Sequence, residues 1–211
     1  NYTIKQWDLS PKDLDRAVME RIPIRTNTDD RYFSDKFQGI PKSGYTSLFK
    51  EMLSRKNITV KLNADYFEMK NELECDLLVY SGPVDRFFDY KFGKLKYRSL
   101  DIVFEECEKK EFQPVAVVNY PNEEKYTRIT EYKKFLDETS DKTVISKEYP
   151  MWGGEPFYPV LDDENKKINE KYQEEVNVLG NKVIFAGRLA NYKYYNMDQA
   201  FENALNLFNK L

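Results

Sequence analysis

Apolar and polar positions follow two different periods along the chain, which predicts helices near both ends and a sheet between them. Residues 10–22 begin with a Ser-Pro helix start, and residues 43–53 repeat apolar side chains at helical spacing. Pro23 would end the first of these helices. Residues 26–41 are polar and rich in Asn and Asp, so we expect a long loop there.

From residue 58 onward the period changes to two, which is the period of a half-buried strand. Several segments alternate or form short apolar runs, and turn residues separate them, so we expect an antiparallel sheet. The predicted strands are 58–62, 75–80, 94–104, 115–118, 127–130 and 143–146.

The last fifty residues return to a helical pattern. A charged amphipathic helix is predicted over 163–176, a buried strand over 183–186, and a final helix from Asn196. The residues of this last helix that we expect to face inward are Ala200, Leu205 and Phe208. The predicted fold class is α+β.

Composition excludes several kinds of chemistry. The 211 residues include no histidine, which removes Ser-His-Asp and Cys-His nucleophiles and histidine-ligated zinc. Cys75 and Cys107 have neither metal-binding nor disulfide spacing, so no metal site is predicted and a reducing cytoplasm is the simplest setting. A net charge of -3 argues against nucleic-acid binding. No apolar run approaches the roughly 20 residues that cross a membrane.

Arginine and tyrosine gather in segments that could bind a phosphorylated ligand. Arg21 and Arg25 flank a proline before the polar loop, Arg128 lies on a predicted strand, and Glu148 follows another. Arginine binds phosphate through paired hydrogen bonds, and tyrosine adds a stacking face and a hydroxyl. Spacing alone leaves plainer interpretations open, namely solvated loop charges, a cross-strand ion pair and an exposed glutamate.

The segment 187–200 carries the most specific pattern. A buried strand ends at Gly-Arg, a turn with three tyrosines follows, and a helix begins at Asn196. Free N–H groups at a helix N-terminus favour an anion, such as a phosphate or a reduced flavin ring. An ordinary strand-helix unit of an α/β sheet is the alternative.

Over essentially the whole chain, these segments resemble UDP-galactopyranose mutases. Residues 187–200, Gly-Arg-Leu-Ala-Asn-Tyr-Lys-Tyr-Tyr-Asn-Met-Asp-Gln-Ala, are similar to the closing motif of that family. Further similar segments, in the order of the family, are 21–25, 30–33, 39–45, 80–85, 95–100, 117–120 and 127–132.

The resemblance implies a flavoprotein isomerase that interconverts UDP-galactopyranose and UDP-galactofuranose for cell-envelope polysaccharide synthesis. It implies FAD as the cofactor, whose reduced form attacks the anomeric carbon through N5, displaces UDP and lets the sugar reclose in the other ring size. It is compatible with a homodimer of the full-length protein. We expect neither nucleic acid as a partner nor insertion into a membrane.

The resemblance also implies roles for individual residues. The implied catalytic residues are Arg21 and Arg128 at the diphosphate and Glu148 near the sugar. The implied substrate-binding residues are Tyr2, Trp7, Tyr32, Asn119, Tyr158 and Tyr194. The implied FAD contacts are Gly187, Arg188, Asn196 and Met197.

The same resemblance divides the chain into three parts. Residues 1–56 would end a helical substrate domain with a mobile loop, residues 57–160 would form the sheet domain, and residues 161–211 would supply the closing strand and helix of the FAD-binding α/β domain. Asn196 stands where many family members have Asp, so a role that needs a carboxylate there is in doubt.

The sequence has no Gly-x-Gly-x-x-Gly motif after a strand, which the dinucleotide-binding fold requires. We therefore expect a fragment or one piece of a longer mutase, inactive alone, whose last strand lacks parallel neighbours and leaves an apolar patch. One alternative is a nucleotide-sugar binding module without catalysis. Another is a relative of flavin amine oxidases, which would need an aromatic cage for an amine instead of diphosphate arginines.

Overall fold

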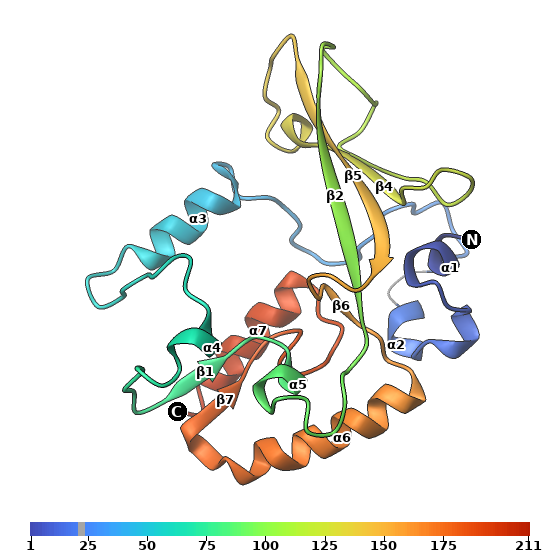
Figure 1. Cartoon of the computed structure of the whole chain (residues 1–211). Coiled ribbons are helices and arrows are strands. Elements are labelled where there is room, and N and C mark those ends of the chain that lie inside the picture. Colours follow the sequence, from blue (N-terminus) through green and yellow to red (C-terminus); the bar gives the residue numbers. More distant parts are fainter. Residues whose placement is uncertain (21–23) are drawn as a thin grey trace.

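A long antiparallel two-stranded ribbon rises from a helical base in the computed structural model, which describes residues 1–20 and 24–211 (Figure 1). This β2–β5 ribbon pairs β2 (Tyr97–Cys107) with β5 (Thr143–Trp152), and two other strands of the sheet lie between them in the sequence. The other strands of this five-stranded sheet, ordered β3-β4-β5-β2-β6, are β3 (Val117–Asn119), β4 (Arg128–Glu131) and β6 (Tyr158–Pro159). The predicted mixture of helices and an antiparallel sheet is confirmed, while the division into three domains stays a prediction.

Strand register decides which side chains of the sheet meet. Arg128 of β4 lies opposite Glu148 of β5 and opposite Asn119 of β3. Directly opposed residues point to the same face of a sheet. One arginine, one glutamate and one asparagine are therefore neighbours on that face.

A second, two-stranded sheet corrects the prediction for residues 75–80. The strand is shorter, β1 (Leu78–Tyr80), and pairs in parallel with β7 (Val183–Phe185) instead of joining the antiparallel sheet. The expectation that the last strand lacks parallel neighbours is also wrong, because β1 is one. Burial explains the pairing: Tyr80 and Phe185 are 6% exposed and belong to one core. The other buried members of that core are Val84, Leu95, Tyr172, Ala190 and Tyr192.

The two predicted helices of the C-terminal region are confirmed, but one prediction about their packing is wrong. α6 (Asp163–Val178) runs along the base, and the Asp162 carboxylate caps it by accepting a hydrogen bond from the Asn165 N–H at 2.8 Å. α7 (Met197–Phe208) begins with a capping box at Asn196. Its predicted inward residues Leu205 and Phe208 are 48% and 71% exposed, because no described element covers that face.

The N-terminal region differs most from the prediction. Over the described residues 10–20, the helix expected over 10–22 is two short pieces, a 3-10 turn η1 (Pro11–Asp13) and α2 (Arg16–Met19). Its expected end at Pro23 lies outside the described residues. The chain is extended between them at Leu14, whose side chain is 8% exposed, so burial overrides the helical pattern. A helix that the pattern did not predict, α1 (Tyr2–Trp7), precedes them.

Between these regions one helix is confirmed and one strand is not. α3 (Gly44–Leu53) follows a segment, residues 24–43, without helix or strand, as predicted. Residues 58–62 form no strand, and Leu62 is 81% exposed. The remaining short helices are α4 (Tyr66–Met69), α5 (Val84–Phe87), η2 (Tyr132–Phe135) and η3 (Gly180–Lys182). No helix in the described ranges has the length and apolarity to span a membrane.

Candidate functional site

A cavity of about 470 Å³ lies where α1, the lower part of the large sheet and the turn after β7 come together. It gathers residues from segments far apart in the sequence. The residues that line it are Tyr2, Thr3, Gln6, Trp7, Val18, Tyr32, Asn119, Pro121, Arg128, Glu148, Tyr158, Arg188 and Tyr194.

All six residues predicted to bind substrate line this one cavity, and so do two of the predicted catalytic residues, Arg128 and Glu148. The third, Arg21, lies outside the described residues. Of the residues predicted to contact FAD, only Arg188 lines the cavity. The structure thus brings the predicted substrate residues together, whereas Gly187, Asn196 and Met197 are not part of the cavity wall.

Arg128 is fixed in place by three neighbours. Its Nε donates to Asn119 Oδ1 at 3.1 Å, its Nη2 donates to the Tyr2 hydroxyl at 3.4 Å, and its Nη1 lies 3.7 Å from Glu148 Oε2. Burial by itself would lower the pKa of Arg128, but attraction to Tyr2 and Glu148 outweighs it and the pKa is raised. The cavity therefore contains a permanent and oriented positive charge.

Glu148 is mostly buried and poorly satisfied. Its side chain is 15% exposed, its nearest cation is Arg128, and no group in the described ranges donates a hydrogen bond to its carboxylate. Burial raises the pKa of Glu148 although Arg128 opposes the shift. A carboxyl group with a raised pKa in a cavity is suited to bind a hydroxyl or to exchange a proton.

Three aromatic rings form one wall of the cavity. Trp7 lies 6.1 Å from Tyr158 and 5.6 Å from Tyr194, and the two tyrosines stack at 5.7 Å, all between ring centroids. The guanidinium of Arg188 lies over both tyrosines, at 5.1 and 5.3 Å. Arg188 Nε also donates to the Tyr195 carbonyl at 3.1 Å, which keeps the guanidinium against these two rings.

The sequence analysis named Tyr2 and Trp7 of α1 only through the family resemblance and did not name the other cavity residues of that helix. Gln6 is 9% exposed, and its Oε1 accepts a hydrogen bond from the Thr127 hydroxyl at 3.1 Å. A signal exists in the sequence: Tyr2 and Gln6, like Thr3 and Trp7, are four residues apart and so share a helix face. The segment is too short for that periodicity to predict a helix by itself.

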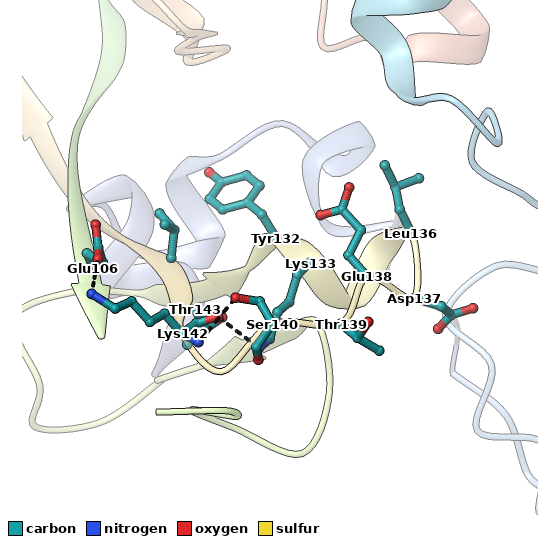
Figure 2. A pocket seen from close by; sticks show the side chains of 11 residues that line it. Glu106, Tyr132, Lys133, Leu136, Asp137, Glu138, Thr139, Ser140, Lys142 and Thr143 are labelled. Carbon is teal, nitrogen blue, oxygen red and sulfur yellow. Dashed lines mark hydrogen bonds and ion pairs between the residues drawn. The ribbon is translucent and has the colours of Figure 1, made fainter. Parts of the chain in front are cut away.

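A larger hollow, of about 710 Å³, lies at the tip of the β2–β5 ribbon, and two lysines of its wall bond to groups of the same region. Figure 2 shows Lys133, whose Nζ donates to the carbonyls of Ser140 and Lys142 at 2.9 and 3.0 Å. Lys142 Nζ in turn donates to Glu106 Oε1 at 3.2 Å. These contacts stabilise the turn, and none of the predicted site residues that the structure describes lies there.

No metal centre accompanies either cavity. Within the described part of the chain, no group of three or more Cys, Asp or Glu is arranged to hold a metal ion. The charged and aromatic groups of the smaller cavity are those expected in a binding site for a phosphorylated, ring-containing ligand.

Comparison with known sequences agrees with that class of site. The family described as UDP-galactopyranose mutase matches residues 1–194. The chain therefore belongs to the UDP-galactopyranose mutase family.

Individual relatives cover the chain almost completely. A probable UDP-galactopyranose mutase of Klebsiella pneumoniae is 39% identical over 210 residues, which are 97% of this chain and 54% of that protein. A dTDP-fucopyranose mutase of Escherichia coli is 37% identical over 214 residues, covering 97% of this chain and 56% of that protein. The chain thus spans about half the length of these curated relatives.

A solved structure is similar in fold. The crystal structure of a reduced UDP-galactopyranose mutase superposes with a TM-score of 0.50 and 14% identity, over 64% of this chain and 42% of that chain. At this identity the likeness concerns the fold only.

Proposed function

We propose that the protein is an isomerase that interconverts UDP-galactopyranose and UDP-galactofuranose, and that this chain supplies the UDP-sugar site. Family membership and the names of the relatives support the reaction class. The observation that carries the assignment of the site is the cavity in which Arg128 faces the aromatic wall of Trp7, Tyr158 and Tyr194.

Arg128 would bind the diphosphate. Negative charge develops on the β-phosphate when UDP leaves the sugar, and a cation already oriented in a buried site stabilises that charge without reorganisation. Its contacts with Tyr2 and Asn119 provide this orientation. In this assignment Asn119 acts chiefly by directing Arg128.

The tyrosines would complete the diphosphate site. Burial raises the pKa of Tyr158, so its hydroxyl keeps its proton and can donate a hydrogen bond to a phosphate oxygen. Tyr194 stacks on Tyr158 and would present a second hydroxyl beside it. Tyr2, at the start of α1, offers a ring on which uracil can stack.

Glu148 would lie near the sugar. Because no described residue donates a hydrogen bond to its carboxylate, a sugar hydroxyl would be a suitable partner. Its raised pKa also allows it to take up or release a proton during ring opening and closure.

Gly187, Arg188, Asn196 and Met197 fit contact with one edge of a flavin. Gly187 has φ +95°, and a Cβ placed on it would meet nothing within 4 Å, so a flat ring could approach its backbone. Met197, at the start of α7, is 68% exposed. When bound there in reduced form, FAD would supply the nucleophile for the anomeric carbon.

A second candidate is a mutase for a dTDP-linked sugar. The observation in its favour is the similarity to the E. coli dTDP-fucopyranose mutase, at 37% identity against 39% for the Klebsiella protein. Competition between UDP and dTDP for the cavity separates the two candidates, since the preferred nucleotide should bind more tightly.

The test uses the full-length protein in reduced form with UDP-galactofuranose as substrate. We expect formation of UDP-galactopyranose, and we expect UDP to change the fluorescence of Trp7, which is 5% exposed and lines the cavity. Binding of UDP without turnover would favour the non-catalytic binding module. Absence of UDP binding would contradict the assignment of the site.

A further inference from the structure

α1 carries two groups of the proposed site, Tyr2 and Trp7, yet it has only six residues. Isolated helices of that length are not stable in water, because the first turn is costly to form. The Asn1 side chain makes no hydrogen bond that caps the start of α1, and at the other end only the Asp8 backbone N–H closes the last turn, by donating to the Ile4 carbonyl. The position of these two rings must therefore depend on contacts with other parts of the chain.

One such contact comes from Arg98 at the start of β2. Arg98 is 2% exposed, and its Nε donates to the Gln6 carbonyl at 3.0 Å. Carbonyl groups in the last turn of a helix lack a partner within the helix, so this bond satisfies one of them. It ties the end of α1 to the large sheet.

A second contact joins the same two elements through Trp152 of β5. Its indole lies under the guanidinium of Arg98, with 4.5 Å between the Cζ atom and the ring centroid. The indole Nε1 donates to Asp8 Oδ2 at 2.8 Å. Asp8 ends α1 in the left-handed conformation, with φ 54°. Arg98 and Trp152 therefore each donate a hydrogen bond to the C-terminal end of α1, to the Gln6 carbonyl and to the Asp8 carboxylate.

Fold stability alone does not account for a charge at this position. Arg98 Nη1 is buried and has no hydrogen-bond partner in the described part of the chain, which costs free energy. Burial lowers the pKa of Arg98, and the charge of Asp8 only partly opposes this. Buried charges that are incompletely paired often destabilise a fold relative to apolar residues.

We propose that Arg98 is a positioning residue for the nucleotide site. Through the Gln6 carbonyl and the Trp152–Asp8 hydrogen bond, it fixes α1 so that Tyr2 and Trp7 line the cavity. It does not itself line the cavity. This inference rests on the proposed function, because it assigns Arg98 to the affinity for the UDP part of the substrate.

The test measures UDP affinity of the full-length protein by calorimetric titration. Arg98→Gln removes the charge and the guanidinium that lies over the Trp152 ring. It should weaken UDP binding by about tenfold, equivalent to about 1.4 kcal/mol. In a Tyr2→Ala background the same substitution should weaken binding by less than about threefold, because coupled residues are non-additive. Equal losses in both backgrounds would contradict the proposal.

A matched control separates positioning from general destabilisation. Tyr172→Phe removes the two hydrogen bonds of a core hydroxyl away from α1, its donation to the Gly93 carbonyl at 2.7 Å and its acceptance from the Phe92 N–H at 3.1 Å. It should lower the melting temperature and leave UDP affinity unchanged. A loss of UDP affinity as large as that of Arg98→Gln would show that any destabilisation has this effect, and would overturn the proposal.

A milder variant keeps the test decisive if Arg98→Gln does not fold. Trp152 is 42% exposed, and Trp152→Phe keeps a ring beneath Arg98 while removing the hydrogen bond to Asp8. We expect UDP binding about threefold weaker, or about 0.7 kcal/mol. Unchanged affinity would refute the role of this contact. Failure of the wild type to bind UDP would instead refute the proposed function.

Discussion

Two glutamates on neighbouring strands of the large sheet have pKa values shifted in opposite directions, because they differ in the hydrogen-bond donors around them. Glu131 lies at the end of β4 that points to the tip of the β2–β5 ribbon, and Glu148 lies on β5 at the cavity. The register opposes Glu148 to Arg128 and Glu131 to Ile145, which places the two carboxylates on opposite faces of the sheet.

Glu131 is fully satisfied by its surroundings. It is 0% exposed, and its carboxylate accepts hydrogen bonds from the Thr143 hydroxyl at 2.8 Å and from the N–H groups of Gln113 and Phe112 at 3.0 and 3.1 Å. Burial favours the neutral form, but these donors outweigh it and the pKa of Glu131 is lowered. The Glu131 carboxylate joins β4 to the segment before β3.

Glu148 is less completely buried, with its side chain 15% exposed, and among the described residues only Arg128 lies beside its carboxylate, at 3.7 Å. Burial raises the pKa of Glu148. The difference between the two sites is therefore the number of donors and not the residue type. A buried carboxylate with its donors in place belongs to the fold, whereas one without them is available to a ligand.

The largest expected effect is that of removing the cation of the cavity. Arg128→Ala should lower turnover of UDP-galactofuranose by the full-length protein about a hundredfold or more, equivalent to about 3 kcal/mol, because the leaving diphosphate loses an oriented charge. Steady-state assays of the reduced enzyme measure this. As a matched control, Arg86→Ala removes an arginine paired with Asp65 at 2.9 Å outside the cavity and should retain parental turnover.

The next largest effect is expected from replacing the Glu131 carboxylate, whose hydrogen bonds are all made within the fold. Glu131→Gln should lower the free energy of unfolding by about 2 kcal/mol, because an amide N–H₂ then faces groups that are themselves donors. Urea denaturation at neutral pH provides the value. UDP affinity should not change.

The pH dependence of that loss has a definite sign. The folded-state pKa of Glu131 is below its ordinary value of 4.5, so its stabilising contribution is present above pH 4.5 and is lost as the pH falls through the folded-state pKa. The stability difference between the parent and Glu131→Gln should therefore narrow in acid. A difference that widens would contradict the hydrogen-bonding account.

Glu148→Gln should behave in the opposite sense and with a smaller effect. The folded-state pKa of Glu148 lies above its ordinary value of 4.5, so the parent loses stability as the pH rises from 4.5 through the folded-state pKa. Glu148→Gln has no ionisable group at this position, so it lacks this pH-dependent loss and should gain stability relative to the parent over the same pH range. Denaturation at a series of pH values tests this, and a constant difference would argue against a raised pKa.

The smallest effect of a substitution is expected at the tip of the β2–β5 ribbon. Lys142 bonds to Glu106 and Glu108, but all three side chains are more than half exposed. Exposed ion pairs of this kind are screened by solvent and contribute little. Lys142→Ala should change neither the melting temperature nor turnover measurably, and a clear loss of turnover would assign a function to the tip that this account does not give it.

The sequence predicted the long periodic elements and missed those decided by packing. α3, α6 and α7 agree with their apolar periods, and the expected antiparallel sheet is present, with β2 and β5 as its longest strands. The extended chain at Leu14 and the parallel pairing of β1 depend on burial against distant residues, which a local pattern does not contain. Residues 58–62 alternate without any partner strand, so alternation alone was insufficient.

The candidate site could be anticipated only through the family resemblance. Arginine and tyrosine positions alone were equally consistent with surface charges and ordinary ion pairs. The sheet register, which brings Asn119, Arg128 and Glu148 to one face, follows from strand pairing and was not visible in spacing. The hold of Arg98 on α1 depends on a contact across more than ninety residues of sequence, which no local pattern contains.

A crystal structure of the full-length protein with bound UDP tests the central claim most directly. We expect the diphosphate to accept hydrogen bonds from the Arg128 guanidinium, at about 2.7–2.9 Å, with Tyr158 and Tyr194 beside it and uracil against Tyr2. UDP bound elsewhere, with Arg128 still turned toward Asn119 and no phosphate near it, would contradict the assignment.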